Sequence, residues 1–238
     1  MTKKIFWQDP YLTQLETRIA SVDGNDVTVA ETIFYALSGG QESDHGTIGS
    51  KRVLQARNEG RDIVYTLEAY HGLKSGDAVR IEIDWERRYK LMRLHLAAEL
   101  VLELVYQNFD SIEKVGAHIA QDKARIDFEW QASISEKLPL IREKALAIVE
   151  ADKEIISAFS DRENQRRYWE IEEFARVPCG GTHLQKTGEI GDMKLKRKNP
   201  GKGKERNELR SICVMHSHLP YGKDVYASHD QIIAVKTS

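Results

Sequence analysis

The sequence predicts an α+β protein in which a strand-rich N-terminal part precedes a larger part that mixes helices and strands. Up to residue 85, short β-prone runs alternate with turn signals, and no helical period appears. From 86 to 108, apolar residues recur every three or four positions, which indicates a helix. Beyond it, strand-like segments alternate with a second helical pattern. We therefore expect two domains, 1–85 and 86–238.

The first domain is predicted to be a small antiparallel β-barrel, because several short strands follow one another at regular spacing. Turn residues such as Gly24 and Gly60 separate consecutive runs, and the last run alternates inward and outward side chains. The expected strands cover 18–22, 27–32, 53–56, 62–67 and 78–85.

A glycine motif, Ser38-Gly39-Gly40-Gln41, interrupts these strands. Paired glycines allow the backbone to approach a ligand closely, and their N–H groups can meet an oxygen of a substrate. The motif therefore marks a candidate substrate pocket. A flexible hairpin loop is the alternative interpretation.

The helix expected at 86–108 carries two features that bear on function. Arg87 and Arg88 place positive charge in its first turn, where the helix dipole disfavours it, which hints at phosphate binding; a solvated basic face is the alternative. His95 and Glu99 lie one turn apart on the apolar side. A buried Glu is normally paired or coordinates a metal, so these two residues are candidate ligands.

The remaining elements alternate in type. Strands are expected at 115–120, 124–130, 155–159, 169–174 and 209–214, and a helix over 135–153, with Ser135 as its N-cap. Cys213 falls in the last strand and is expected to be a buried structural thiol.

The string Cys179-Gly180-Gly181-Thr182-His183 places a thiol and an imidazole four positions apart, with a glycine pair that lets the chain fold back. Both side chains are preferred zinc ligands, so Zn²⁺ is the expected cofactor. A Cys–His nucleophile pair is the competing chemistry, but it needs an orienting third group that the sequence does not identify.

The segment 194–206 is strongly basic in a chain whose formal net charge is −2. We expect a mobile loop that follows a phosphate backbone without reading its sequence; a solvated loop is the alternative. Its candidate tRNA contacts, together with Arg87 and Arg88, are Lys196, Arg197, Lys198, Lys202 and Lys204.

Composition excludes several classes of protein. No apolar run reaches 18 residues, so no membrane span is expected, and the N-terminal residues lack the apolar core of a signal peptide. The two cysteines give no disulfide framework. We therefore expect a cytoplasmic protein.

Taken together, these motifs resemble the free-standing alanyl-tRNA editing proteins, the AlaX group, whose catalytic part is similar to the editing domain of alanyl-tRNA synthetase. The most specific carrier is the Cys179–His183 string followed by Thr187-Gly188-Glu189-Ile190-Gly191. The resemblance also rests on the glycine motif, on 84–88, on Arg93-Leu94-His95 and on 198–203.

The resemblance implies a zinc-dependent editing domain of the threonyl/alanyl-tRNA synthetase type behind a β-barrel. It implies a hydrolase that removes chiefly serine, with glycine as a second substrate, from mischarged tRNA(Ala), with His95, Glu99, Cys179 and His183 as the residues that would hold zinc. Thr182 is a candidate for contacting the serine hydroxyl. Such proteins usually carry His-x₃-His on the helix, whereas here the second position is Glu99.

Glu99 leaves three outcomes open: an oxygen ligand, a general base beside an open metal position, or weakened metal binding with little activity. The last outcome corresponds to a second class of function, a tRNA-binding module that keeps the fold without the catalysis. A zinc hydrolase acting on small esters is a further alternative.

Overall fold

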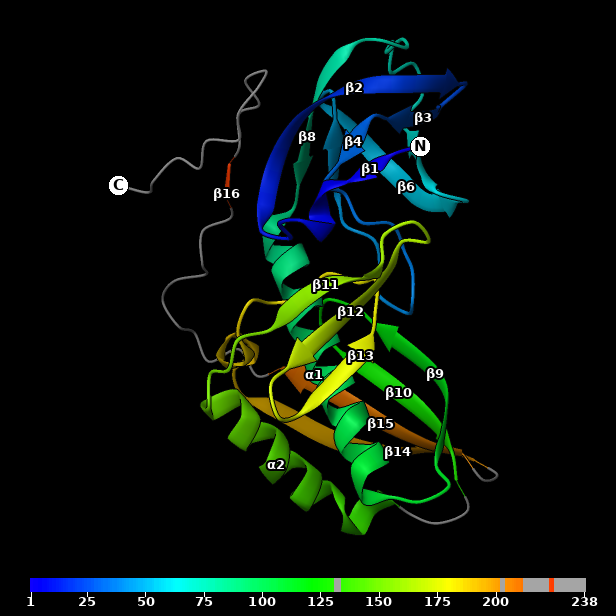
Figure 1. Ribbon diagram of the computed structural model, residues 1–238. Coiled ribbons are helices and arrows are strands. Elements are labelled where there is room, and N and C mark those ends of the chain that lie inside the picture. Colours follow the sequence, from blue (N-terminus) through cyan, green and yellow to red (C-terminus); the bar gives the residue numbers. More distant parts are fainter. Residues whose placement is uncertain (131–133, 202–203, 212–222, 225–238) are drawn as a thin grey trace. The chain divides into compact units, whose positions relative to one another are not determined.

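The computed structural model describes residues 1–130, 134–201, 204–211 and 223–224 (Figure 1). These residues form two units. The first contains Met1–Ser38 and Ser43–Arg88 together with 223–224, and the second contains Gly39–Glu42 with the described residues from Tyr89 to 211. Gly39, Gly40 and Gln41 of the glycine motif are therefore part of the second unit, although they lie in the sequence among the strands of the first, which keeps Ser38. The domains expected at 1–85 and 86–238 remain a prediction.

The first unit is built almost entirely of strands. Its elements are β1 (Lys3–Lys4), a 3-10 turn (Ile5–Trp7), β2 (Leu12–Asp23), β3 (Asp26–Val29), β4 (Glu31–Thr32), β5 (Gly46–Ile48), β6 (Lys51–Glu59), β7 (Asp62–Leu67), β8 (Ala78–Ile83) and β16 (Lys223–Asp224). Strands pair in the order β16-β2-β3-β7-β6-β5-β8, and β8 pairs again with β2. The pairing from β2 through β8 thus closes on β2. Such closure is compatible with the barrel predicted from the sequence, which remains a prediction.

The long strand β2 explains how the pairing returns to its start. Residues 14–18 pair with β8, and residues 19–23 pair with β3, with a register shift between Ile19 and Ser21. A shift of this kind bends a strand and increases its twist, so one strand can serve two neighbours. Inward residues such as Leu15, Ile19, Val27 and Ile81 form the core of the unit.

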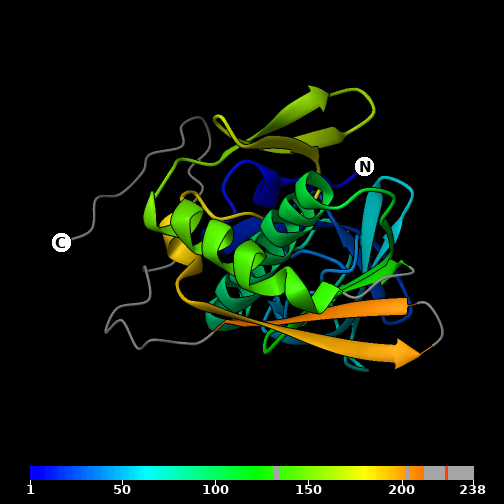
Figure 2. The same cartoon turned by 90° about the horizontal axis from the view of Figure 1, so that it is seen from below.

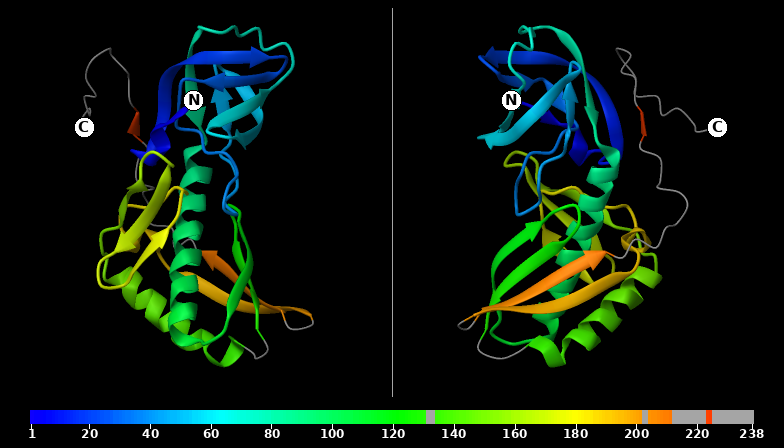
Figure 3. Two further views of the ribbon diagram at one scale, coloured as in Figure 1. Left: turned by 45° about the vertical axis from the view of Figure 1, so that its right-hand side comes forward. Right: turned by 180° about the vertical axis from the view of Figure 1, so that it is seen from behind.

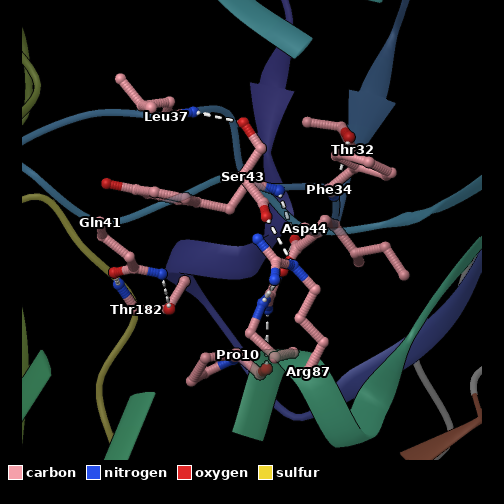
Figure 4. A network of polar contacts seen from close by, with 12 residues as sticks. Pro10, Thr32, Phe34, Leu37, Gln41, Ser43, Asp44, Arg87 and Thr182 are labelled. Carbon is pink, nitrogen blue, oxygen red and sulfur yellow. Dashed lines mark hydrogen bonds and ion pairs between the residues drawn. The ribbon is translucent and has the colours of Figure 1, made fainter. Parts of the chain in front are cut away.

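A buried ion pair joins the start of helix α1 (Trp85–Asn108) to the first unit. Arg88 and Asp44 are fully buried and bonded to each other, and Arg88 also donates to the carbonyls of Ile33 (2.6 Å) and Pro10 (3.0 Å) (Figure 4). Asp44 in turn accepts the N–H of Tyr35 at 2.7 Å. The basic first turn of the helix is therefore compensated by the protein itself.

The second unit contains two sheets and two helices. Its elements are the rest of α1, β9 (Glu113–Ile119), β10 (Ala124–Glu129), a 3-10 turn (Ile134–Glu136), α2 (Leu138–Glu150), β11 (Ile156–Asp161), β12 (Arg166–Ile171), β13 (Ala175–Pro178), a 3-10 turn (Thr187–Ile190), β14 (Met193–Gly201) and β15 (Lys204–Ser211). The sheets have the orders β14-β15-β10-β9 and β11-β12-β13. Figures 2 and 3 show α1 running between them.

The central position of α1 follows from its sequence. Apolar residues occur on most of its circumference, and Leu91, Met92, Leu96, Leu100 and Val105 have no exposed surface. A helix that is apolar all round needs packing partners on several sides, and the two sheets provide them. Polar residues on such a helix, such as His95 and Glu99, are consequently placed in the interior.

Three expectations about elements are corrected. Helix α2 begins at Leu138 after Lys137, so Ser135 is not its N-cap and lies in a 3-10 turn instead. The described residues of the basic segment, 194–201 and 204–206, lie in strands and not in a loop, because β14 and β15 pair antiparallel from Met193↔Ser211 to Gly201↔Lys204. Strand β12 starts at Arg166, three residues earlier than expected. Cys213, predicted to be a buried thiol, lies outside the described residues. No helix in the described part of the chain is long and apolar enough to cross a bilayer.

Replacing Asp44 by Asn should lower the free energy of unfolding by about 3–5 kcal/mol, because the buried Arg88 charge would lose its partner. Urea titration measures the change. The matched control is Glu16→Gln, which breaks the exposed pair of Glu16 with Arg80 and should change stability by no more than about 1 kcal/mol. Equal losses in the two variants would contradict the structural role given to Arg88.

Candidate metal centre

Four side chains from two distant stretches of sequence meet in the second unit. His95 and Glu99 come from α1, and Cys179 and His183 follow β13. One ligand atom from each residue lies within 4.8 Å of the others. His95 and His183 are only 4% exposed, so the cluster is an interior feature. The structure brings together all four residues expected to be metal ligands.

Local geometry explains why the Cys179 string contains glycines. The N–H of Cys179 donates to the carbonyl of Arg167 at 2.9 Å, which continues the pairing of β12 with β13. At Gly181 a Cβ atom would lie 2.1 Å from Cε1 of His95, so only glycine allows the imidazole to pack there. The N–H of Gly181 also points to the sulfur of Cys179 at 3.4 Å.

Three separations within the cluster match those of neighbouring zinc ligands. Sγ of Cys179 lies 3.6 Å from Nε2 of His95, and Oε1 of Glu99 lies 3.4 Å from the same nitrogen. Oε2 of Glu99 lies 3.2 Å from Nε2 of His183. Zinc–ligand bonds of the usual length separate neighbouring donors by about 3.3–3.7 Å in a tetrahedron. The sulfur, nitrogen and oxygen donors present here could therefore hold a zinc-like ion.

The cluster is strongly coupled electrostatically. Burial alone would lower the pKa of His95, but the negative charges of Glu99 and Cys179 outweigh it and raise that pKa well above its usual value. Burial likewise acts against ionised Glu99, yet His95 and His183 hold its pKa well below the ordinary range. Despite its burial, Cys179 has a pKa of about 7, mainly because of His95. Without an ion, charged imidazoles and the carboxylate thus stabilise one another.

The outer nitrogens of the two imidazoles differ in their surroundings. Nδ1 of His183 lies 3.4 Å from the hydroxyl of Ser157 on β11. Nδ1 of His95 is buried and has no hydrogen-bond partner among the described residues. Metal-binding histidines usually have such a partner, which fixes the orientation of the ring. Here close packing against Gly181 fixes the ring of His95 instead.

The glycine motif reaches the cluster through Gln41. Gly40 and Glu42 exchange backbone hydrogen bonds with Ile119 of β9, and a Cβ atom at Gly40 would lie 2.8 Å from the carbonyl oxygen of Ala117. Gln41 is fully buried, and its side chain donates to the hydroxyl of Thr182 at 2.9 Å (Figure 4). Ser38 and Gly39 are exposed. The backbone around Gly40 is therefore bonded to β9, and the side chain of Gln41 is bonded to Thr182. These contacts differ from what a flexible hairpin, the alternative interpretation, would make.

A second set of contacts near the cluster was not recognised as functional from the sequence. The guanidinium of Arg93 donates twice to the carbonyl of Ile190, at 2.6 and 2.9 Å. Glu189 accepts the hydroxyl of Tyr89 and the backbone N–H groups of Gln185 and Lys186. These bonds fix the turn after His183 against α1. The sequence signal for these contacts is the Thr187–Gly191 string, which contains both Glu189 and Ile190.

The basic residues fall into three groups. Arg87 is buried and donates to the carbonyl of Ser43, and Arg88 pairs with Asp44, so both guanidiniums are engaged within the first unit. Lys196 is exposed on β14, and Arg197 is half-buried beside it. Lys198 and Lys204 belong to β14 and β15, whereas Lys202 lies outside the described residues.

Comparisons with known proteins were consistent with this site. The alanyl-tRNA editing protein AlaX-M of Pyrococcus horikoshii is 32% identical over 213 residues, which cover 88% of this chain and 97% of that protein. The chain belongs to the alanyl-tRNA editing protein family. Its relative in Saccharolobus solfataricus is 31% identical over 232 residues, covering 87% of this chain and 97% of that protein.

The editing proteins share this region with larger enzymes. Residues 167–208 match the family described as the second additional domain of threonyl and alanyl tRNA synthetases. The alanine–tRNA ligase of Ignicoccus hospitalis is 32% identical over 219 residues, which cover 82% of this chain but 24% of that protein. The likeness to the ligase is therefore confined to about a quarter of its length.

Gly181→Ala should weaken metal binding by the editing protein by about tenfold to a hundredfold, because the new methyl group displaces His95. Metal content after dialysis and competition with a chelator measure the effect. Gly180→Ala is the matched control, since a Cβ atom there meets nothing within 4 Å. Unchanged affinity in Gly181→Ala would contradict the role of His95 as a ligand.

Metal affinity should rise with pH. The pKa values of His95 and His183 are raised, so protons occupy their ligand nitrogens to a higher pH than in free histidine, and the thiol of Cys179 titrates at a pKa of about 7. A metal ion must displace these protons. Calorimetry in buffers of different ionisation enthalpy should show net proton release at neutral pH and less release as the pH rises. Binding without proton release would contradict this charge distribution.

Proposed function

We propose that the protein hydrolyses the ester of mischarged tRNA(Ala), removing serine and also glycine, with Zn²⁺ as its cofactor. The observation that carries the proposal is the buried set of His95, Glu99, Cys179 and His183 in a chain of the editing family. In the reaction the ester C–O bond breaks, the oxygen of water ends on the released amino acid, and the terminal ribose recovers its hydroxyl. A zinc ion held by these residues would supply a Lewis acid for the ester carbonyl.

Glu99 is assigned to the fourth donor position in this proposal. Each of its two oxygens lies within 3.4 Å of the inner nitrogen of one histidine, as expected for neighbours around one ion. A carboxylate that ligates through one oxygen keeps the second, which can accept a proton from the attacking water. The ligand and base roles left open by the sequence are thus combined in one residue.

Thr182 and the glycine motif form the proposed amino-acid pocket. Thr182 accepts a hydrogen bond from Gln41, so its own hydroxyl hydrogen remains to be donated to a second acceptor. The hydroxyl of a seryl group is such an acceptor, so this bond would favour a seryl ester over an alanyl ester. Ser38, Gly39 and Gly40 line the approach in the proposal, and Gln41 holds Thr182 in place.

The proposed tRNA contact uses the hairpin of β14 and β15. Lys196, Arg197, Lys198, Lys202 and Lys204 retain the role expected from the sequence, since the described ones belong to two paired strands, and basic residues on strands can meet a phosphate backbone as well as those of a loop can. Arg87 and Arg88 are left out of the contact because the protein interior engages their guanidiniums. The β-barrel 1–85 and the editing domain 86–238 are the proposed domains.

Replacement of Glu99 tests the proposed function. Glu99→Gln should reduce hydrolysis of seryl-tRNA(Ala) by about 10²–10⁴-fold, because an amide cannot accept the proton. It should also weaken zinc binding, because an anionic ligand is lost. Deacylation of labelled seryl-tRNA and metal content are measured together. Glu103→Gln, one turn further along α1 and outside the cluster, is the control.

The two measurements also separate the competing functions. A wild-type protein that binds tRNA tightly, without metal and without turnover, would contradict the proposal and show a binding module. Fast hydrolysis of free esters that added tRNA does not affect would show a small-ester hydrolase. Loss of turnover with full metal content in Glu99→Gln would show a base that is not a ligand.

A further inference from the structure

Arg167 lies beside the candidate metal centre and has no role in the proposed reaction. It is on β12, opposite Cys179 in the register that pairs Tyr168 with Pro178. Residues opposite each other on antiparallel strands project from the same face of a sheet, so Arg167 and Cys179 share a face. The side chain of Arg167 is on the face that meets the metal ligands.

The neighbouring strand extends this row of side chains. Phe159 of β11 is opposite Arg167, and its ring lies 4.5 Å from the guanidinium. Two residues back on the same face, Ser157 reaches Nδ1 of His183 at 3.4 Å. This face of the sheet β11-β12-β13 (Figure 1) therefore carries two adjacent rows. One row contains Phe159, Arg167 and the ligand Cys179, and the other contains Ser157, which reaches His183.

A second arginine is close to the same ring. The guanidinium of Arg162, which follows β11, lies 5.0 Å from the ring centre of Phe159. Burial lowers the pKa of Arg167 to about 10; the charge of Cys179 raises it, and the like charge of Arg162 lowers it further. Two guanidiniums at one aromatic ring repel each other, and a bound anion would remove that cost.

A bound divalent ion would not neutralise this wall of the site. With one thiolate, one carboxylate and two neutral imidazoles, the centre would have a net charge of zero. Arg162 and Arg167 would then leave the wall positive. Guanidinium groups bind phosphate oxygens in pairs of parallel hydrogen bonds, so phosphate is the anion that this row suits best.

We propose that Arg167, assisted by Arg162 and held by the ring of Phe159, binds the phosphodiester nearest the ester of the substrate, on the 5′ side of the terminal nucleotide. This inference rests on the proposed function, since it places the ester at the metal centre. The terminal phosphate is separated from the ester by one ribose, and Arg167 lies beside the metal ligands, directly opposite Cys179 on the neighbouring strand. The single-stranded 3′ end of tRNA offers such a phosphate without unpairing any base.

The test compares two substrates that differ in phosphate. Arg167→Met should raise the KM for seryl-tRNA(Ala) at least about tenfold, the scale of a lost charge-assisted hydrogen bond. The loss on 3′-O-seryl-adenosine, which has no phosphate, should be much smaller. Binding of uncharged tRNA should also depend less on salt, with the slope of log K against log salt reduced by about 0.7. Arg167→Lys should recover part of the affinity.

Arg166→Met is the matched control. It removes the same charge from the neighbouring position of β12, which is exposed and projects from the opposite face. An equal effect of both variants would overturn the inference, because a general positive potential would then explain it. Equal losses of Arg167→Met on tRNA and on the adenosine ester would also overturn it and assign the guanidinium to the ester.

Failure of the proposed function gives a different result. In that case the wild-type protein hydrolyses neither substrate, whereas the salt dependence of tRNA binding still compares Arg167→Met with the wild type. Metal content and circular dichroism of each variant show that the site and the fold are intact. If Arg167→Met does not fold, Arg167→Lys gives the same comparison with the charge kept and the paired hydrogen bonds lost.

Discussion

The contact between Gly181 and the imidazole of His95 is the constraint on which the site depends. This contact holds the segment of Cys179 and His183 against His95 of α1, because the two approach so closely that a Cβ atom at Gly181 would lie 2.1 Å from the ring. It also replaces the hydrogen bond that would normally orient a metal-binding histidine, since Nδ1 of His95 has no partner within the described ranges. Orientation by packing requires rigid surroundings. The Arg93 bonds to Ile190 and the fastening of Gly40 to β9 supply such rigidity on both sides of the string.

Helix α1 is mostly apolar, but it carries four polar residues that bind partners from other segments or form the metal cluster. Arg88 binds Asp44 in the first unit, whereas Arg93, His95 and Glu99 act in the second. Buried polar groups are costly unless each is satisfied, so each of these residues needs a partner from another segment. The sequence distance between partners is large, up to 97 residues for Arg93 and Ile190. The site can therefore form only when the whole second unit has folded.

Local patterns in the sequence carried part of this structure. The helix over 86–108 was predicted to within one residue, because its apolar period is long and uninterrupted. The four cluster residues were found because two i, i+4 pairs of ligand types are rare. The predicted start of α2 was wrong: Ser135 satisfies the N-cap pattern, but the chain first makes a 3-10 turn and starts the helix at Leu138, with Pro139 as its second residue.

Long-range contacts explain the other differences. The charges of Arg87 and Arg88 suggested phosphate, and nothing near them in the sequence reveals that Asp44 and the carbonyl of Ser43 engage them. The segment 194–206 has loop composition, yet pairing with a strand of its own hairpin and then with β10 determines its conformation. The role of Arg167 depends on strand register, which single-sequence patterns do not give.

Glu99 changes the electrostatics of the centre as well as its donor set. A zinc ion with Cys179 and three histidines, the arrangement that the family resemblance implies, would have a net charge of +1. With Glu99 in place of the third histidine, the charge is zero. A neutral centre attracts an anionic tRNA end less strongly, so positive charge must come from neighbouring side chains. Arg167 lies opposite the ligand Cys179, and Arg162 is close to the same aromatic ring, Phe159, so both are near the cluster. In the proposed site the carboxylate and the arginine pair would be complementary: the carboxylate would reduce the attraction at the metal, and the arginines would place it at the phosphate.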